Sequence, residues 1–318
     1  MPVYFDCDTG VDDSLALGYL VASPEIELVG IGSVSGNIDA ARAARNTLDV
    51  LALAGVTGVP VAVGAHDPLR GRYAGGAPLV HGRNGIGDVE LPASPEQPIE
   101  GSAAELLVRL AHEHPGRLRV LAVGPFTNLA LALQLEPRLP ELVADVVVMG
   151  GAALVPGNLS AVAEANIAND PEAARVVLDA PWPVTLVPLD VTMVNLLEES
   201  DRRALLAAAH PLPQALGAIL DLYFDFYRPI LGRRCSALHD PLAAAILTGG
   251  VNATLAPVVR ATVDDSDGPG RGQTICDLRG MYAGYPEQRG AHCSVVLDID
   301  VPLAPHLMGR LVPTGGKS

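Results

Sequence analysis

Lysine is almost absent from this 318-residue chain, because Lys317 is the only one. A phosphate-binding P-loop, a Schiff-base lysine and any other mechanism with an internal catalytic lysine are therefore excluded. The formal net charge of −15 makes nucleic acid and anionic membranes unfavourable partners. Aromatic residues make up only 4% of the chain, so the core must be built from Val, Leu, Ile and Ala.

Cysteines and long hydrophobic runs are also few. The four cysteines form neither a CxxC pair nor a Cys/His cluster with zinc spacing, so we expect them to be reduced and partly buried: Cys7, Cys235, Cys276 and Cys293. No apolar run reaches the ~18 residues of a membrane span. The chain starts directly with an apolar strand and shows no signal-peptide pattern, so the expected location is the cytoplasm.

Apolar and amphipathic stretches alternate through the first sixty residues. The pattern predicts strands at 3–6, 27–34 and 59–63, with helices at 13–22 and 39–54 between them. Fully apolar strands in this order are typical of a parallel sheet covered by helices on both faces. The alternation resumes near residue 103, without an internal repeat or a linker of different composition. In this second part we expect a strand over 184–191, a largely helical stretch over 198–228 and a strand-like stretch over 256–263. We therefore expect an α/β fold with an open, mostly parallel sheet, formed by residues 1–318 as one domain.

Residues 64–100 break this alternation, because they are rich in Gly and Pro and show no clear period. Loops of this length inside compact domains are usually functional or disordered. The stretch 66–100 is therefore a candidate lid. It carries His81, although a loop histidine is more often a surface residue than a ligand.

Polar side chains gather where the predicted strands end. Acidic residues follow the first strand, Asn37 follows the second, and two further polar segments, 124–128 and 158–166, follow later strands. In open α/β sheets, ligands bind outside the carboxyl ends of the strands. The sequence therefore predicts a ligand site at this edge of the sheet.

Four carboxylates crowd the turn after the first strand: Asp6, Asp8, Asp12 and Asp13. Like charges this close repel one another, and a hard cation such as Ca²⁺ or Mg²⁺ would remove the repulsion. Gly10 permits a tight turn that brings Asp8 and Asp13 together. The alternative is an acidic surface turn that caps a helix, although capping needs only one or two of these residues.

The turn from Asp6 to Asp13 resembles the DxDxGxDD signature of the inosine-uridine preferring nucleoside hydrolase family. Further blocks resemble family motifs in family order: Ser35-Gly36-Asn37, Val123-Gly124-Pro125-Phe126-Thr127-Asn128, Met149-Gly150-Gly151, Asn158 with Ala163-Glu164-Ala165-Asn166, and His239-Asp240-Pro241. The resemblance implies an open α/β fold, a homodimer or homotetramer, a bound Ca²⁺ and hydrolysis of the N-glycosidic bond of ribonucleosides.

The resemblance also implies a metal site. Asp8, Asp13 and Asp240 would hold Ca²⁺ with their carboxylates, and Val123 would add its backbone carbonyl. Asp6 would orient the turn. Asp8 would be the base that takes a proton from a calcium-bound water, since such a water is more acidic than bulk water.

The substrate contacts implied by the resemblance fall into two groups. Asp12, Asn37 and Asn166 would bind the 2′ and 3′ hydroxyls of ribose, Asn158 and Glu164 the 5′ hydroxyl, and Met149 would pack under the sugar. No cationic residue is available there for a 5′ phosphate, so a nucleoside fits better than a nucleotide.

At the base end, His239 would donate a proton to the departing base, or would only orient Asp240. His81 would contact the base from the lid. Tyr227 would lie near the base, or would be a core residue of a helix. Ala165 stands where relatives often carry a bulky aromatic, so the preference for a purine or a pyrimidine stays open.

Two rival interpretations remain. The Asp6-Cys7-Asp8-Thr9 stretch loosely resembles the turn of haloacid dehalogenase-like phosphatases, in which Asp6 would be a nucleophile with Mg²⁺. That class expects a later Lys or Arg, usually Lys, to steady the phosphoryl group, and the chain has no internal lysine. The other rival is a calcium-stabilised protein that binds a nucleoside or ribose without turnover; the presence of both Asp8 and His239 argues against it.

Overall fold

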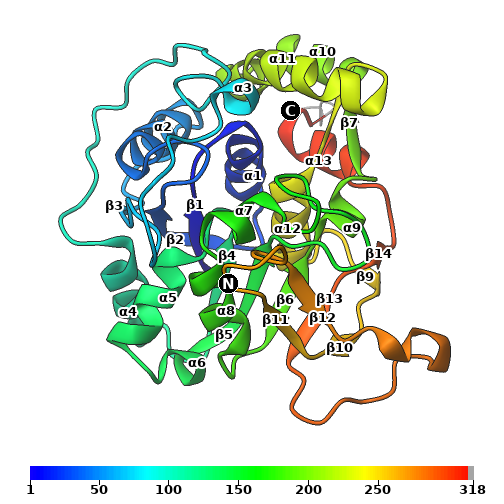
Figure 1. The fold of residues 1–318 in the computed structure, drawn as a ribbon. Helices are drawn as coiled ribbons and strands as arrows, with labels where there is room; N and C mark the ends of the chain where they lie inside the picture. Colours follow the sequence, from blue (N-terminus) through cyan, green and yellow to red (C-terminus); the bar gives the residue numbers. More distant parts are fainter. Residues whose placement is uncertain (314–318) are drawn as a thin grey trace.

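The computed structural model describes residues 1–313. Its centre is an eight-stranded sheet with the order β10-β13-β6-β5-β4-β1-β2-β3, in which only β10 runs antiparallel to its neighbour (Figure 1). The strands are β1 (Pro2–Cys7), β2 (Glu27–Ser33), β3 (Val61–Val63), β4 (Leu118–Ala122), β5 (Val143–Met149), β6 (Val184–Val187), β10 (Val258–Val259) and β13 (Cys293–Val295). The predicted open, mostly parallel sheet is confirmed.

Strand β1 lies inside the sheet, and all six of its residues are buried. Its side chains alternate between two hydrophobic clusters: Val3 and Phe5 belong to one, and Tyr4 belongs to the other. The first cluster receives side chains from helices α1 (Val11–Val21), α2 (Ala40–Leu53), α11 (Pro211–Leu231), α12 (His239–Thr248) and α13 (Leu303–Leu311). The second cluster receives side chains from helices α4 (Ala103–Glu113), α5 (Thr127–Leu135) and α8 (Pro171–Asp179). Helices therefore cover both faces, as predicted (Figure 1).

Smaller elements surround this frame. Three two-stranded sheets pair β7 (Leu196–Glu198) with β8 (Cys235–Ala237), β9 (Ala253–Leu255) with β14 (Asp298–Ile299), and β11 (Ala261–Val263) with β12 (Thr274–Cys276). The short helices are α3 (Pro78–His81), α6 (Leu139–Leu142), α7 (Ala165–Asn169), α9 (Leu189–Thr192), α10 (Glu199–Leu206) and the 3₁₀ helix η1 (Arg279–Ala283). Within residues 1–313, no helix combines the length and the apolar character that a membrane crossing requires.

The structure refines the sequence pattern at three places. The strand expected over 184–191 ends at Val187, because Pro188 precedes the short helix α9. The largely helical stretch expected over 198–228 is confirmed, and it consists of two helices, α10 and α11, the second of which begins at Pro211. The strand expected over 256–263 is shared by β10 and β11, which pair with different partners.

Asp170 joins three segments of the fold. Its buried carboxylate accepts hydrogen bonds from the Thr127 hydroxyl at 2.7 Å and from the Leu69 and Ala173 backbone N–H groups at 2.8 and 3.0 Å. It therefore caps α8 and also ties that helix to α5 and to the segment after β3. Hydrogen bonds to a buried charged group are among the stronger ones in a protein.

We predict that Asp170→Ala lowers the free energy of unfolding by about 3 kcal/mol, because three donors lose their acceptor. Urea unfolding would measure the change. Asp179→Ala, on the same helix but half exposed, is the matched control and should change stability by less than about 0.5 kcal/mol. Equal losses in the two variants would contradict the structural role given to Asp170.

Candidate active site

The turn between β1 and α1 is closed by the carboxylate of Asp13. That carboxylate accepts hydrogen bonds from the backbone N–H groups of Asp8 at 3.1 Å and Gly10 at 2.8 Å. A Cβ atom on Gly10 would lie 2.5 Å from Nδ1 of His81, so only glycine fits this position. The turn therefore presents its acidic side chains at the carboxyl end of β1, where the sequence predicted them.

The loop after β2 packs directly against this turn. The backbone N–H of Asn37 donates to Oδ2 of Asp8 at 2.6 Å, and its side-chain amide donates to Asp13 at 3.2 Å. A Cβ atom on Gly36 would lie 2.1 Å from Oδ2 of Asp8, which requires glycine here as well. Asp8 is consequently held between two strand ends, and burial followed by repulsion from Asp13 raises its pKa well above the usual range.

Asp6 lies deeper, at the end of β1, and does not line the cavity described below. It accepts hydrogen bonds from the Tyr4 hydroxyl at 2.8 Å and from the Asn128 amide at 3.0 Å. The same amide also donates to the backbone carbonyl of Ser33 at 2.8 Å. Burial raises the pKa of Asp6 to about 7. These contacts join β1, β2 and α5 beneath the acidic turn.

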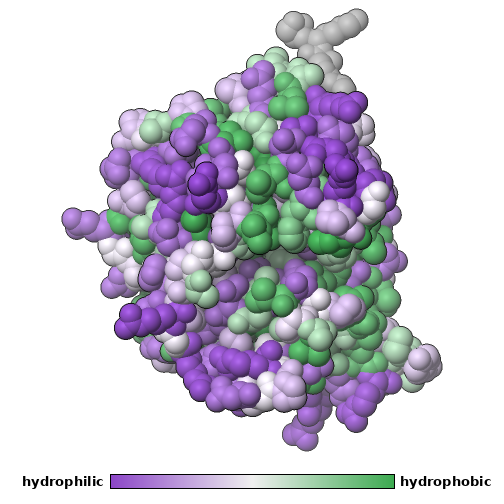
Figure 2. All heavy atoms as spheres, turned by 45° about the horizontal axis from the view of Figure 1, so that its top comes forward, coloured by the Kyte–Doolittle hydropathy of each residue, from purple (hydrophilic) through white to green (hydrophobic). Residues whose placement is uncertain are grey.

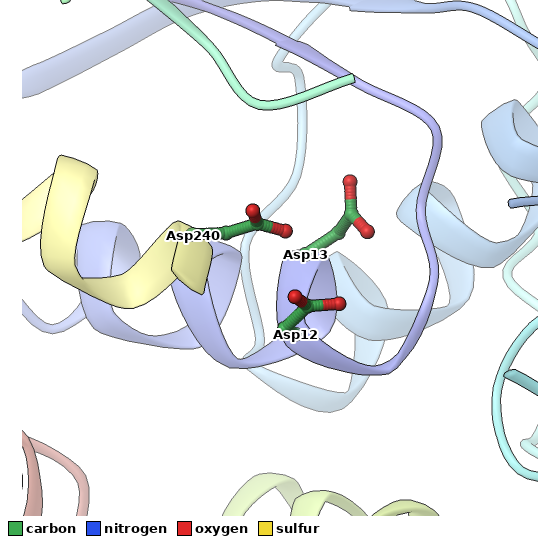
Figure 3. A group of neighbouring side chains, drawn as sticks. All are labelled: Asp12, Asp13 and Asp240. Carbon is green, nitrogen blue, oxygen red and sulfur yellow. The ribbon is translucent and has the colours of Figure 1, made fainter. Parts of the chain in front are cut away.

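Three carboxylates meet at one point: those of Asp12, Asp13 and Asp240. Each offers one oxygen within 4.8 Å of the others, and the side chains extend from the first turns of α1 and α12 (Figure 3). Burial raises the pKa of Asp12 to about 7, with Asp13 adding to the shift, and it raises the pKa of Asp240 well above its usual range. Oδ1 of Asp12 and Oδ1 of Asp8 are buried without a hydrogen-bond partner.

These features fit a divalent cation. Unpartnered buried carboxylate oxygens cost free energy, and a cation with oxygen ligands would supply the missing partner. The structure groups Asp12 with Asp13 and Asp240, whereas the resemblance implied Asp8 in that place. Asp8 is close enough to Asp13 for its carboxyl pKa to be raised by that neighbour, so it lies at the border of the same cluster.

Asn166 connects the cluster to the end of β5. Its amide donates to the backbone carbonyls of Val123 at 2.7 Å and Met149 at 3.1 Å. The Val123 carbonyl, a predicted metal ligand, therefore already accepts one hydrogen bond and keeps a second lone pair. Strand ends β4 and β5 are thus fixed relative to each other by one side chain.

Glu164 and Asn158 shape the loop that follows β5. Glu164 is the N-cap of α7, and its carboxylate accepts hydrogen bonds from the backbone N–H groups of Gly151, Asn166 and Ile167. Asn158 accepts a hydrogen bond from the backbone N–H of Ala165 at 2.9 Å. Both side chains therefore have a structural role in the loop in addition to any substrate contact.

Helices α9, α11 and α12 bring a group of aromatic side chains next to the acidic cluster. The Tyr227 hydroxyl lies 2.7 Å from Nε2 of His239, whose Nδ1 lies 2.8 Å from the Thr192 hydroxyl. The Tyr223 hydroxyl donates to Asp12 at 3.1 Å. Burial lowers the pKa of His239 to about 4, so the ring is neutral near pH 7.

Sequence reasoning found Tyr227 and His239 and missed Tyr223 and Thr192. Tyr223 stands four residues before Tyr227 on α11, a spacing that places both on one face of a helix and could have pointed to it. Thr192 carries no comparable signal, because it meets His239 from a different helix, 47 residues away.

His81 enters the site at the end of α3. Its Nδ1 accepts a hydrogen bond from the backbone N–H of Val11 at 3.1 Å, so the proton of the neutral ring is on Nε2. Burial, followed by the nearby His239, lowers the pKa of His81 to about 3. His81 is buried, so the surface interpretation of this histidine is wrong.

The segment around His81 is anchored. The Gly87 backbone N–H donates to the His81 carbonyl at 2.7 Å, and the Asn46 amide donates to the carbonyls of both Thr9 and Asn84. The candidate lid therefore contains one helical turn that is tied to α2 and to the acidic turn. Closure of 66–100 over a ligand stays a prediction.

One cavity of about 390 Å³ unites these groups. Most of the residues singled out in the sequence line it: Asp12, Asn37, His81, Val123, Met149, Asn158, Glu164, Asn166, Tyr227, His239 and Asp240. Asp8 and Asp13 are buried beside it. The cavity thus has a carboxylate-rich wall on the strand ends and an aromatic wall on α11.

Known proteins are similar to this chain in sequence and in fold. The family model described as inosine-uridine preferring nucleoside hydrolase matches residues 3–304. A probable uridine nucleosidase 2 from Arabidopsis thaliana is 38% identical over 75% of this chain and 74% of its own. An inosine-uridine preferring nucleoside hydrolase from Crithidia fasciculata is 34% identical over 94% and 93%. The structure of a purine-preferring ribonucleoside hydrolase from Gardnerella vaginalis superposes with a TM-score of 0.89 at 32% identity, covering 98% of each chain.

The chain belongs to the inosine-uridine preferring nucleoside hydrolase family. It is therefore an enzyme that hydrolyses the N-glycosidic bond of ribonucleosides. This nucleoside hydrolase also carries an acidic cluster that could hold the metal on which the family depends.

The raised carboxyl pKa values predict a pH-dependent stabilisation by a divalent cation. In the metal-free nucleoside hydrolase, Asp6 and Asp12 bind protons with pKa values of about 7, whereas aspartates of the unfolded chain have pKa values near ~3.9. The folded state then binds more protons than the unfolded one between about pH 4 and pH 7, so stability falls as the pH rises through this range.

A divalent cation bound at the cluster should replace the proton of Asp12, and calcium is the ion with which this can be tested. We therefore expect the rise in Tm on adding calcium to chelator-treated, desalted protein to be larger at pH 8 than at pH 5. Thermal unfolding with and without calcium at both pH values would measure it. An equal rise at the two pH values would contradict the charge assignment of the cluster.

Proposed function

We propose that the chain is a calcium-dependent ribonucleoside hydrolase in which Asp8 is the general base and His239 assists departure of the base. One observation carries the proposal: the carboxylates of Asp12 and Asp240, the first with an unpartnered oxygen, and a neutral histidine–tyrosine pair line the same cavity. Cleavage of an N-glycosidic bond needs negative charge beside the sugar and a proton donor beside the leaving base, and this arrangement offers both.

The proposed ligands of the calcium are Asp13, Asp240, Asp8 and the Val123 carbonyl, to which the structure adds Asp12 as a candidate. When bound, calcium would make a coordinated water more acidic and offset the repulsion between the carboxylates. Asp8 then accepts the proton of the attacking water. The water oxygen forms a bond to C1′ of ribose while the bond from C1′ to the base nitrogen breaks.

The base leaves with the electron pair of the broken bond and must be protonated. His239 is neutral and forms a hydrogen bond with the Tyr227 hydroxyl, and this pair is the proposed source of the proton for the base. The transfer leaves the pair one proton short, and a proton from solvent restores it before the next turnover. Thr192 holds the other ring nitrogen. His81 directs its Nε2–H away from the Val11 contact and is the proposed second contact to the base.

The ribose would lie between these walls. Asp12, Asn37 and Asn166 are the proposed ligands of the 2′ and 3′ hydroxyls, and Asn158 and Glu164 those of the 5′ hydroxyl, with Met149 packed under the ring. No arginine is among the residues that line the cavity in the described part of the chain, which favours a nucleoside over a nucleotide.

Base preference cannot be transferred from relatives, because their names differ. The matched proteins are called uridine nucleosidase, inosine-uridine preferring and purine-preferring.

We propose that residues 1–318 form one domain that assembles as a homodimer or homotetramer. A cytoplasmic location stays a prediction.

The structure disfavours the phosphatase alternative. A nucleophilic Asp6 would have to face the cavity, but Asp6 is buried and occupied by Tyr4 and Asn128. The binding-protein alternative differs from the hydrolase only in turnover, so measured hydrolysis of a nucleoside distinguishes the two.

We expect ribose release from at least one of inosine, uridine, cytidine, adenosine and guanosine, and its loss when calcium is removed. Asp8→Asn should lower kcat by about 10³-fold, because the amide cannot accept the proton from water. Asp179→Asn, on an exposed helix face, is the control and should keep wild-type kcat. A kcat for Asp8→Asn within fivefold of wild type would remove Asp8 from the role of base.

A second test isolates the proton donor. His239→Ala should lower kcat by about 10²-fold for natural nucleosides. With p-nitrophenyl β-D-ribofuranoside, whose leaving group departs as a stable anion, the same variant should lose less than about threefold. Equal losses on both substrates would show that His239 only orients Asp240.

A further inference from the structure

The cavity changes character toward its opening. Its inner part carries Asp12, Asn166 and Asp240, which are all buried. Its outer part carries five apolar side chains, which we call the apolar mouth: Val80, Leu159, Met193, Phe226 and Ile230. Leu159 and Ile230 are 62% and 54% exposed, so the apolar mouth lies at the solvent end.

The apolar mouth is assembled from four separate segments. Val80 lies on α3, Leu159 on the loop after β5, Met193 directly after α9, and Phe226 and Ile230 on α11. Figure 2 shows apolar residues bordering the hollow in the middle of this face. Single exposed apolar residues are ordinary, but several that converge on one cavity mark a ligand-binding surface.

The wall that carries two of these residues is firmly held. Arg234 pairs with Glu199, Asp221 and Asp225, and the last two lie on the outer face of α11. Phe226 packs edge-on against Tyr227, with 5.2 Å between the ring centroids. The apolar mouth is therefore a continuation of the wall that meets the base.

We propose that the apolar mouth binds a hydrophobic substituent on the base, so that ribonucleosides with alkylated bases are substrates of this enzyme. The inference rests on the proposed function, since the carboxylate end must hold the ribose. With the ribose there, the base passes Tyr227 and His239, and its far edge enters the apolar mouth. The far edge is the C4–C5 side of a pyrimidine and the C6 side of a purine.

The chemistry of the apolar mouth supports an alkyl group over a polar one. Four of its five side chains are hydrocarbon, and Met193 adds a weakly polar thioether. Ala165 also lines the cavity and leaves space beside the sugar and base. An alkyl group that leaves water for this surface gains binding free energy at no cost in unpaired hydrogen bonds.

A remote substituent is bound equally well before and during the reaction. It should therefore lower KM and leave kcat nearly unchanged. For a propyl group that becomes partly buried, the expected gain in kcat/KM is about tenfold.

The experiment compares uridine with 5-propyluridine and adenosine with N6-propyladenosine on the calcium-loaded full chain. The parent nucleosides report the proposed function. The ratio of kcat/KM for the alkylated compound over its parent reports the inference. We expect a ratio of about ten in at least one series, arising from KM.

Ile230→Asn and Leu159→Asn should reduce this ratio to about three or less, because each replaces an apolar contact by a polar one. Both residues are exposed, so the substitutions leave the core intact. Leu79→Asn is the matched control: Leu79 is 86% exposed, adjoins Val80 and does not line the cavity, so the ratio should not change.

Three outcomes would overturn the inference. If the parent nucleosides are hydrolysed but the kcat/KM ratio of alkylated compound over parent is one or below in both series, the apolar mouth does not bind a substituent. The proposed function would then still stand. An equal loss of ratio in Leu79→Asn, with a changed oligomeric state by size-exclusion chromatography, would assign the apolar mouth to a second copy of the chain. Absence of turnover for every parent would overturn the proposed function and the inference with it.

Discussion

Burial of like charges at the carboxyl ends of the sheet is the constraint on which the rest of this structure depends. Asp8, Asp12, Asp13 and Asp240 are all nearly inaccessible to water. No lysine or arginine approaches them among the described hydrogen bonds and ion pairs; every contact comes from amides, hydroxyls, a histidine or the backbone. Neutral donors offset only part of the repulsion between carboxylates in a low-dielectric site. The cluster is thus arranged for a cation that the chain itself does not supply.

The fold meets this constraint by using strand ends as a rigid frame. Side-chain amides tie neighbouring strands together: Asn128 spans β1 and β2, and Asn166 spans β4 and β5. Each amide donates to groups that would otherwise lack partners, so the frame and the site use the same hydrogen bonds. A substitution at either position would therefore disturb both the packing of the sheet edge and the site.

The alternation of strands and helices and the acidic turn could be predicted from the sequence because both depend on local patterns: apolar runs of strand length, and four carboxylates around a glycine. The features of the site that the sequence did not predict depend on contacts between residues far apart in the chain. Tyr223 reaches Asp12 across 211 positions, and Thr192 meets His239 only because α9 turns after Pro188. The burial of His81 likewise follows from α3 and from its contact with Val11, since its Gly- and Pro-rich surroundings show no period. Hydrophobic periodicity carries no information about contacts between residues that are far apart in the sequence.

Asp12 shows how the two walls of the cavity depend on each other. One of its oxygens accepts the hydrogen bond of Tyr223 on α11, while the other is buried without a partner near Asp13 and Asp240. A cation bound at the second oxygen would draw negative charge from the first and weaken the bond to Tyr223. Tyr223 packs edge-on against Tyr227, which holds His239. Asp12 and the two tyrosines therefore form a continuous chain of contacts from the carboxylate wall to the group proposed to protonate the base, so we expect metal occupancy and base departure to be linked.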